Sequence, residues 1–112
     1  MKITTRTVGK CKILDCNGPL TLGPATAALR NAVREAVKDG ALKIILNLKD
    51  VHYIDSSGIG EMMSCFVHVR NQGGNLPLLN LNQKVHTLLV IAKLLVIFDI
   101  FDDEQKALEG CE

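Results

Sequence analysis

The stretch YIDSSGIG, residues 53–60, decides the fold because of what lies on either side of it. Before it comes the apolar run LKIILNL, residues 42–48, which is typical of a central strand buried on both faces of a sheet. After it, apolar side chains recur at helical spacing. Ser56 and Ser57 should therefore lie where a strand passes into a helix. A helix start carries a partial positive charge and free N–H groups, so it would tolerate a phosphate on an exposed serine.

The segment before this stretch predicts a hairpin followed by a helix. Residues 2–16 are rich in strand-forming side chains on both sides of a turn at residues 8–10, which is typical of a β-hairpin. Pro24 is well placed at the first position of a helix, and apolar side chains behind it recur at i, i+3, i+4 and i+7. Gly40 should form the C-terminal cap of that helix.

The segment after the stretch continues the alternation of strands and helices. The expected elements are a strand at 76–81, a helix capped by Asn82, a strand at 96–101, and a short helix at 104–108 capped by Asp102 or Asp103. Such alternation implies right-handed crossovers and a mostly parallel sheet. The predicted fold class is α/β: a single domain over residues 1–112, with a mixed, mostly parallel β-sheet, an N-terminal β-hairpin and about four helices packed on it.

The composition excludes several classes of function. Hydrophobic residues make up 47% of the 112 residues and there is no Trp, so the core should be aliphatic. The net charge of +1 comes from scattered Lys and Arg, which argues against a nucleic-acid partner and against attraction to an anionic membrane. The longest apolar-rich stretch, residues 87–100, is interrupted by Lys93 and Asp99 and is too short for membrane insertion.

The cysteine pattern indicates packing thiols. The four cysteines, Cys11, Cys16, Cys65 and Cys111, include no C-x-x-C pair of a zinc or redox site. The N-terminal residues show no apolar signal-peptide core. We therefore expect four reduced thiols in a cytoplasmic protein, and no metal or cofactor.

The serine stretch lacks the marks of an enzyme. The GIG of residues 58–60 has no third glycine two residues later, where Met63 stands, and no Walker lysine follows. The elbow pattern G-x-S-x-G is absent because Ile54 stands two residues before Ser56. His52 is near in sequence, but nothing places it as an oriented base. We expect neither catalysis nor nucleotide binding.

Two interpretations of the serines stay open on local sequence. In the first, Ser56 or Ser57 only caps the second helix, which is worth roughly 1 kcal/mol. In the second, the exposed hydroxyl is phosphorylated, which adds about −1.5 to −2 charges that a docked partner would not tolerate. Met62 and Met63 are about 100° apart on one helix, so one of them should lie at the edge of the core and contribute to a partner surface.

These residues resemble a known family. LNL at 46–48 followed by YIDSSGIG at 53–60 resembles the signature of STAS domains of the anti-sigma-factor antagonist type. The resemblance covers nearly the whole chain and extends to LTLGPAT at 20–26, GGNL at 73–76, KLLVIF at 93–98 and FDDE at 101–104.

The resemblance implies a regulatory function. The unphosphorylated protein would bind an anti-sigma factor with serine kinase activity and free a sigma factor. Phosphorylation would end binding, and a serine phosphatase would restore it. The implied acceptor is Ser56, with Ser57 as runner-up, in a chain that is a monomer or weak dimer. The implied partner-binding residues are Asp55, Ser56, Ser57, Gly58, Ile59, Gly60, Thr21 and Met62.

One loop departs from the family pattern. Relatives often carry Gly-Glu-Leu-Asp before the first helix, whereas this chain has GPLT at residues 18–21. Both acidic positions of the implied partner-binding loop are replaced, so the partner can differ. STAS-like domains also occur as subunits of lipid-transport ATPase complexes and as scaffolds of stress-sensing assemblies, which is the alternative function.

Overall fold

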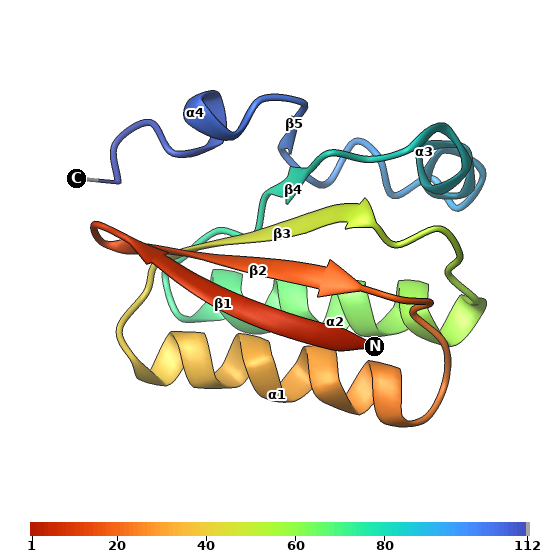
Figure 1. Cartoon of the computed structure of the whole chain (residues 1–112), viewed down its shortest axis with the longest axis horizontal. Coiled ribbons are helices and arrows are strands. Elements are labelled where there is room, and N and C mark those ends of the chain that lie inside the picture. Colours follow the sequence, from red (N-terminus) through yellow and green to blue (C-terminus); the bar gives the residue numbers. More distant parts are fainter. Residues whose placement is uncertain (112) are drawn as a thin grey trace.

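The computed structural model describes residues 1–111, which form one sheet with helices on both of its faces (Figure 1). In chain order the elements are β1 (Lys2–Val8), β2 (Cys11–Asn17), α1 (Pro24–Lys38), β3 (Lys43–Asp50), α2 (Ser56–Asn71), β4 (Leu78–Leu79), α3 (Gln83–Ile91), β5 (Ile100–Phe101) and α4 (Glu104–Ala107). The five strands of this part of the chain lie in the order β1-β2-β3-β4-β5. β1 and β2 are antiparallel, and the other pairs are parallel. The predicted α/β class, with its hairpin and mostly parallel sheet, is confirmed.

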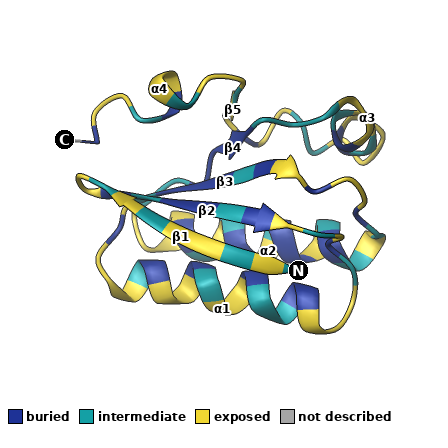
Figure 2. Ribbon diagram, in the orientation of Figure 1, coloured by how far each residue is buried: buried dark blue, intermediate teal, exposed yellow. Residues whose placement is uncertain are grey.

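Side chains of the central strands are buried on both faces of the sheet. The main core lies between the sheet and the helices α1 and α2, and it includes Leu46 of β3. On the other face, Ile13, Ile45 and Leu79 pack against Ala107 of α4. Figure 2 shows β2 and β3 buried along most of their length, whereas β1 forms a largely exposed edge. This confirms the expectation of a strand buried on both faces for residues 43–48, whereas Leu42 lies before β3 and is exposed.

The helix ends lie close to where local chemistry predicts them. Pro24 is the first residue of α1, and Gly40 follows the helix with a φ of +87°, a left-handed conformation that favours glycine. The side chain of Asn82 accepts a hydrogen bond from the backbone N–H of Val85 (2.9 Å) and caps α3. The side chain of Asp103 caps α4 in the same way. These caps confirm the boundaries predicted for the first, third and fourth helices. Among residues 1–111, no helix combines the length and the apolar character needed to cross a bilayer.

The two C-terminal strands are much shorter than predicted. The expected strand at 96–101 is wrong for its first residues, because residues 95–97 form a turn in which the N–H of Ile97 donates to the carbonyl of Leu94 (3.1 Å). Phe98 then enters the core and packs edge-on against Phe66, with ring centroids 5.0 Å apart. β4 is limited to two residues because Pro77 lacks an N–H and Asn80 has a φ of +61°.

The expectation of four reduced cysteines is wrong for one pair. Cys11 and Cys111 form a disulfide across 100 residues of sequence. Cys16 and Cys65 are free and buried, and burial raises the pKa of each thiol to about 12. These two thiols are therefore protonated packing groups, as predicted.

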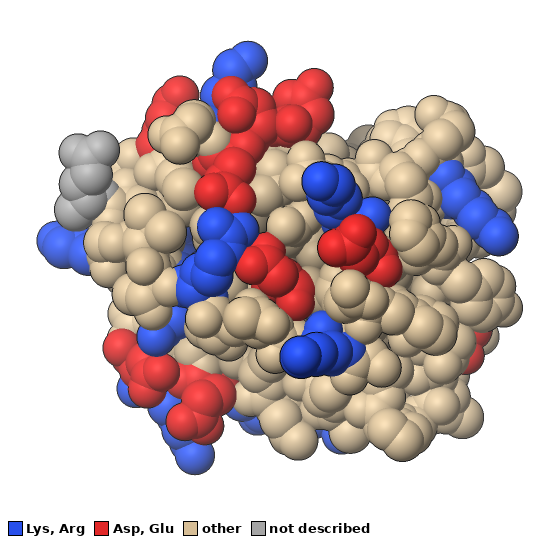
Figure 3. Space-filling model, in the orientation of Figure 1, with Lys and Arg blue, Asp and Glu red and all other residues tan. Residues whose placement is uncertain are grey.

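A polar network lies on the sheet face that α4 covers. Arg6 of β1 donates hydrogen bonds to the carboxylate of Asp15 on β2 (2.6 and 3.0 Å) and to that of Glu104 on α4 (2.7 and 3.2 Å). The amide of Asn47 on β3 also donates to Asp15 (2.8 Å). Figure 3 shows acidic and basic side chains gathered over α4 and the hairpin. The hydrogen bonds from Arg6 lower the pKa of Asp15 and of Glu104.

Removing Arg6 should change the acid sensitivity of the fold. The ordinary pKa values of Asp15 and Glu104 are 3.8 and 4.5, and the folded values lie lower. Their contribution to stability is therefore complete above the ordinary values and is lost as the pH falls through the folded ones. In Arg6→Met the free energy of unfolding should decrease less steeply as the pH falls below about 5. At neutral pH the substitution should lower the free energy of unfolding by about 1 kcal/mol. Urea denaturation at several pH values measures both effects.

Lys49→Met provides the control for charge. Lys49 is exposed at the end of β3 and forms no ion pair within residues 1–111. The substitution Lys49→Met should leave the dependence of the unfolding free energy on pH unchanged. If the unfolding free energy of Arg6→Met decreases with falling pH as steeply as that of the unsubstituted protein, the network does not couple pH to folding.

Candidate functional site

The serine stretch lies against the loop that leads into α1. β2 and β3 are parallel, so the loops that follow them leave the sheet at the same end. Leu20 and Ile54 form an isolated parallel bridge between these loops. The N–H of Leu20 donates to the carbonyl of Tyr53 (2.9 Å), and the N–H of Asp55 donates to the carbonyl of Leu20 (3.2 Å). Residues 20–22 and 53–56 therefore form one surface.

Asp55, rather than either serine, caps the second helix. Its Oδ1 accepts a hydrogen bond from the N–H of Gly58 (2.8 Å), and its Oδ2 accepts one from the N–H of Leu22 (3.1 Å). These two backbone donors, Gly58 first, hold the pKa of Asp55 below its ordinary value. The interpretation of Ser56 or Ser57 as the cap is wrong, because an aspartate with extended backbone already fills that position.

The two serine side chains differ in access. Ser56 is the first residue of α2 and is exposed, whereas Ser57 is half-buried. Both lie at the positively polarised start of a sixteen-residue helix, where N–H groups favour an anion. Ser56 is therefore the more accessible hydroxyl for a second protein.

The two glycines of the stretch have different surroundings. A Cβ at Gly58 would overlap the carbonyl oxygen of Leu20 and lie 2.8 Å from Cγ2 of Ile54, so Gly58 is needed for close packing between the two loops. No atom lies within 4 Å of a Cβ placed on Gly60, which is exposed. Gly60 thus leaves open surface beside Ser56, whereas the buried Gly58 acts through the packing of the loops.

The structure corrects the expectation for Met62. Its side chain is fully buried in the main core, so it does not reach a partner's surface in the folded chain. Met63 and Ile59 are half-buried, and Thr21 is half-buried in the loop before α1. The prediction that one methionine lies at the edge of the core applies to Met63.

Two apolar side chains beside the serines were missed by sequence reasoning. Leu22 is 74% exposed and Tyr53 is 50% exposed, and each lies in a loop that the Leu20–Ile54 bridge holds in place. The ammonium of Lys84 lies over the Tyr53 ring, 5.8 Å from its centroid. We call the surface of Thr21, Leu22, Tyr53, Ser56, Ser57 and Gly60 the serine face. In Figure 3 few charged side chains lie at the lower right of the molecule, which is where Figure 1 places the start of α2.

An ion pair between α1 and α2 lies next to the serine face. Glu61 is 8% exposed, and its Oε1 accepts a hydrogen bond from Nη2 of Arg30 on α1 (2.6 Å). The thiol of Cys65 contacts the other oxygen of Glu61 (3.6 Å). This pair lies one turn beyond the serines, so it helps to fix the position of the helix start relative to α1.

The model of the STAS domain family matches residues 2–107. This chain belongs to the STAS domain family. It is 35% identical over 69 residues to the anti-sigma F factor antagonist of Paenibacillus polymyxa, an alignment that covers 62% of this chain and 59% of that relative. It is 45% identical over 53 residues to the anti-sigma-B factor antagonist of Bacillus subtilis, covering 47% of this chain and 49% of that relative. The matched part thus spans from about half to about three fifths of the length of these relatives.

Solved structures show the same STAS fold. A candidate anti-sigma factor antagonist from Thermotoga maritima superimposes with a TM-score of 0.87 at 27% identity, covering 97% of this chain and 93% of that chain. The anti-sigma factor antagonist SpoIIAA in its unphosphorylated form gives a TM-score of 0.80 at 22% identity, covering 96% of this chain and 94% of that chain. The order of strands and helices seen here is therefore that of the family.

Proposed function

We propose that this STAS domain is an anti-sigma-factor antagonist whose binding is switched off by phosphorylation of Ser56. The observation that carries the proposal is the exposed hydroxyl of Ser56 at the start of α2, where Asp55 already supplies the helix cap. The hydroxyl is thus free of a structural task and accessible to another protein's active site. The relatives from Paenibacillus polymyxa and Bacillus subtilis are both named as antagonists of anti-sigma factors, which supports the choice of partner.

The proposed switch acts through charge at the partner interface. In the unphosphorylated state the serine face docks on an anti-sigma factor that is also a serine kinase. The kinase transfers the γ-phosphoryl group of ATP to Oγ of Ser56, the hydroxyl proton leaves, and ADP is released. The phosphoserine adds about −1.5 to −2 charges, which the start of α2 tolerates. The same charge and bulk beside Asp55 would repel the docked partner. A serine phosphatase in the same cytoplasmic compartment would hydrolyse the ester and restore binding.

Leu22 and Tyr53 would give this interface an apolar character. They flank the serines, and Leu22 directly follows the loop at residues 18–21 in which the family pattern often places acidic residues. Exposed aromatic side chains such as that of Tyr53 are common anchors in protein interfaces. We infer that the cognate partner presents an apolar surface to this loop. This would distinguish it from partners that recognise an acidic loop through basic side chains.

The phosphorylation proposal predicts distinct effects for two substitutions of Ser56. Ser56→Asp should weaken binding to the cognate kinase by about tenfold or more, because it places a charge in the interface. Ser56→Ala should bind normally but resist release by ATP, because it has no acceptor hydroxyl. Neither should change the unfolding free energy by more than about 0.5 kcal/mol, because Asp55 provides the cap. Calorimetric titration and thermal melting measure these effects.

Ser57→Ala is the matched control. It removes the neighbouring half-buried hydroxyl and should leave ATP-dependent release unchanged, because the acceptor hydroxyl of Ser56 is kept. Site-resolved mass spectrometry after incubation with the kinase and ATP should place the phosphate on Ser56. Phosphate on Ser57, or on neither serine, would contradict the proposed mechanism.

A further inference from the structure

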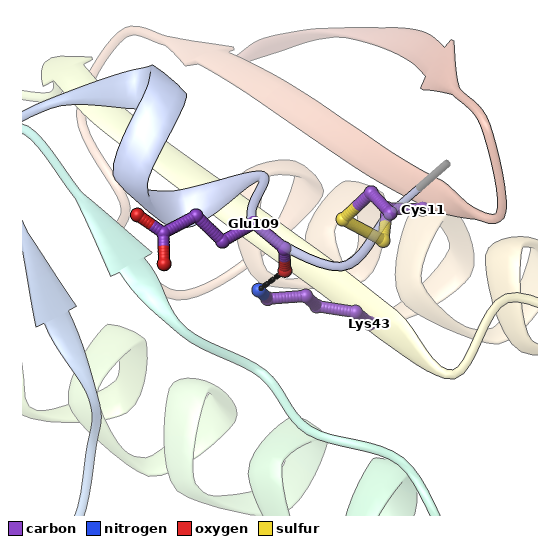
Figure 4. The surroundings of a disulfide bond; sticks show 4 residues. Cys11, Lys43 and Glu109 are labelled. Atoms are coloured by element: carbon purple, nitrogen blue, oxygen red, sulfur yellow. Dashed lines mark hydrogen bonds between the residues drawn. A yellow bond between two sulfur atoms is a disulfide. The ribbon is translucent and has the colours of Figure 1, made fainter.

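The disulfide anchors the segment that follows α4 to the start of β2. It joins Cys11, the first residue of β2, to Cys111 (Figure 4). Around it, the N–H of Lys10 donates to the carbonyl of Cys111 (2.6 Å), and the ammonium of Lys43 donates to the carbonyl of Glu109 (3.2 Å). The disulfide is therefore the covalent attachment of a segment that is otherwise held by hydrogen bonds, by the ion pair of Arg6 with Glu104 and by the apolar contacts of Ala107.

This segment covers a small apolar cluster on the second face of the sheet. Ala107 of α4 is buried against Ile13, Ile45 and Leu79, and Leu108 packs at the edge of the same cluster. α4 has only four residues, so it has little stability of its own and depends on its attachment to the sheet. The main core lies on the opposite face and has far more members. Release of the segment would thus uncover the second face and leave the main core intact.

The disulfide and the serine face lie at opposite ends of the sheet. Cys11 is paired in register with Lys43 at the beginning of β3, whereas Ser56 follows the other end of that strand. Figure 1 shows the same separation: the hairpin turn and the C-terminus lie at the left, and α2 begins at the right. A change at the disulfide can therefore occur without rearranging the phosphorylation loop.

We propose that Cys11 and Cys111 form a reversible thiol–disulfide site whose reduction releases residues 104–111 from the sheet. Both sulfurs are buried, with Cys11 4% and Cys111 1% exposed, so attack follows local opening of the segment. A dithiol reductant attacks one sulfur as its thiolate and forms a mixed disulfide, which its second thiol resolves. Two electrons and two protons pass to Cys11 and Cys111, and the reductant leaves as its own disulfide. A disulfide oxidant such as oxidised glutathione runs the exchange in reverse.

The surroundings of the pair favour reversible exchange. The two free cysteines, Cys16 and Cys65, belong to the main core on the other face, which keeps them apart from the exchange. In the cytoplasmic compartment that the proposed function implies, disulfides are commonly redox-sensing rather than permanent.

Redox titration of the purified chain tests the site. The protein is equilibrated in mixtures of reduced and oxidised glutathione, alkylated, and weighed by mass spectrometry; two alkyl groups should appear and disappear together and reversibly. Hydrogen exchange then compares the two states. The amides of Lys10 and Cys111 should exchange faster by about tenfold or more after reduction, whereas the amide of Gly58 should change by less than about twofold.

Two variants separate the proposal from a permanent cross-link. Cys111→Ser should show the hydrogen exchange of the reduced protein at every ratio of reduced to oxidised glutathione. Cys65→Ala should respond to that ratio like the unsubstituted protein. If Cys111→Ser does not fold, reduction and alkylation of the unsubstituted protein supply the same state. The proposal is overturned if the disulfide does not form in oxidised glutathione, if it is reduced only when the whole chain unfolds, or if hydrogen exchange is equal in the two states. None of these outcomes depends on Ser56.

Discussion

Gly58→Ala should lower the free energy of unfolding by about 2–3 kcal/mol, because the added methyl group overlaps backbone rather than a flexible side chain. The overlapping atom is the carbonyl oxygen of Leu20, which also accepts the N–H of Asp55 (3.2 Å). It cannot move away without weakening the bridge between the two loops. Cγ2 of Ile54, 2.8 Å from the new methyl group, prevents a shift on the other side. Urea denaturation followed by circular dichroism measures the loss.

Gly60→Ala is the matched control for this prediction. Gly60 belongs to the same helix, but no atom lies within 4 Å of an added methyl group there. Alanine is the better helix former, so the substitution should stabilise the fold by about 0.5–1 kcal/mol. Equal effects at the two glycines would show that the close approach of the loops does not explain the requirement for Gly58.

Phe98→Ala should destabilise the fold by about 3–5 kcal/mol, because it empties a site in the main core. Phe98 is 5% exposed, and its ring packs edge-on against Phe66 of α2 at 5.0 Å between centroids. It also anchors the turn at residues 95–97 that leads into β5. The loss should appear in equilibrium denaturation, together with faster hydrogen exchange in β5.

Val96→Ala shortens a neighbouring apolar side chain of the same turn. Val96 is 92% exposed, so its truncation should change the unfolding free energy by less than about 0.5 kcal/mol. A loss at Val96 comparable to that at Phe98 would mean that residues 96–98 pack as a strand with both side chains inside. That result would support the strand predicted from sequence and contradict the turn.

The contrast between these residues explains why one part of the fold was predicted and another was not. The run at residues 42–48 has apolar side chains at nearly every position, and a strand buried on both faces requires that pattern. Residues 96–98 are equally apolar, yet Val96 faces solvent and Phe98 the core. Hydrophobicity over so short a segment does not distinguish a strand from a turn that carries one core anchor.

The candidate site also combines features that the local sequence predicts with features that it does not predict. The position of Ser56 at a strand-to-helix junction follows from local pattern, and so does the availability of Asp55 as a cap residue. The choice of Asp55 as the cap is reinforced by its second hydrogen bond, which comes from Leu22, 33 residues away in the chain. The burial of Met62 in place of Met63 depends on the rotation at which α2 packs on the sheet. The exposure of Leu22 and Tyr53 likewise depends on how two distant loops meet.

The sequence by itself determined the order of strands and helices, most of the helix ends and the place of the serines. These features depend on the spacing of apolar residues and on caps within a few positions of one another, so neighbouring residues suffice to specify them. Only the tertiary structure decided which side chains form the serine face, which methionine is buried, and that Cys11 meets Cys111. These features depend on contacts between residues tens of positions apart, which only the packing of α1, α2 and α4 on the sheet brings together.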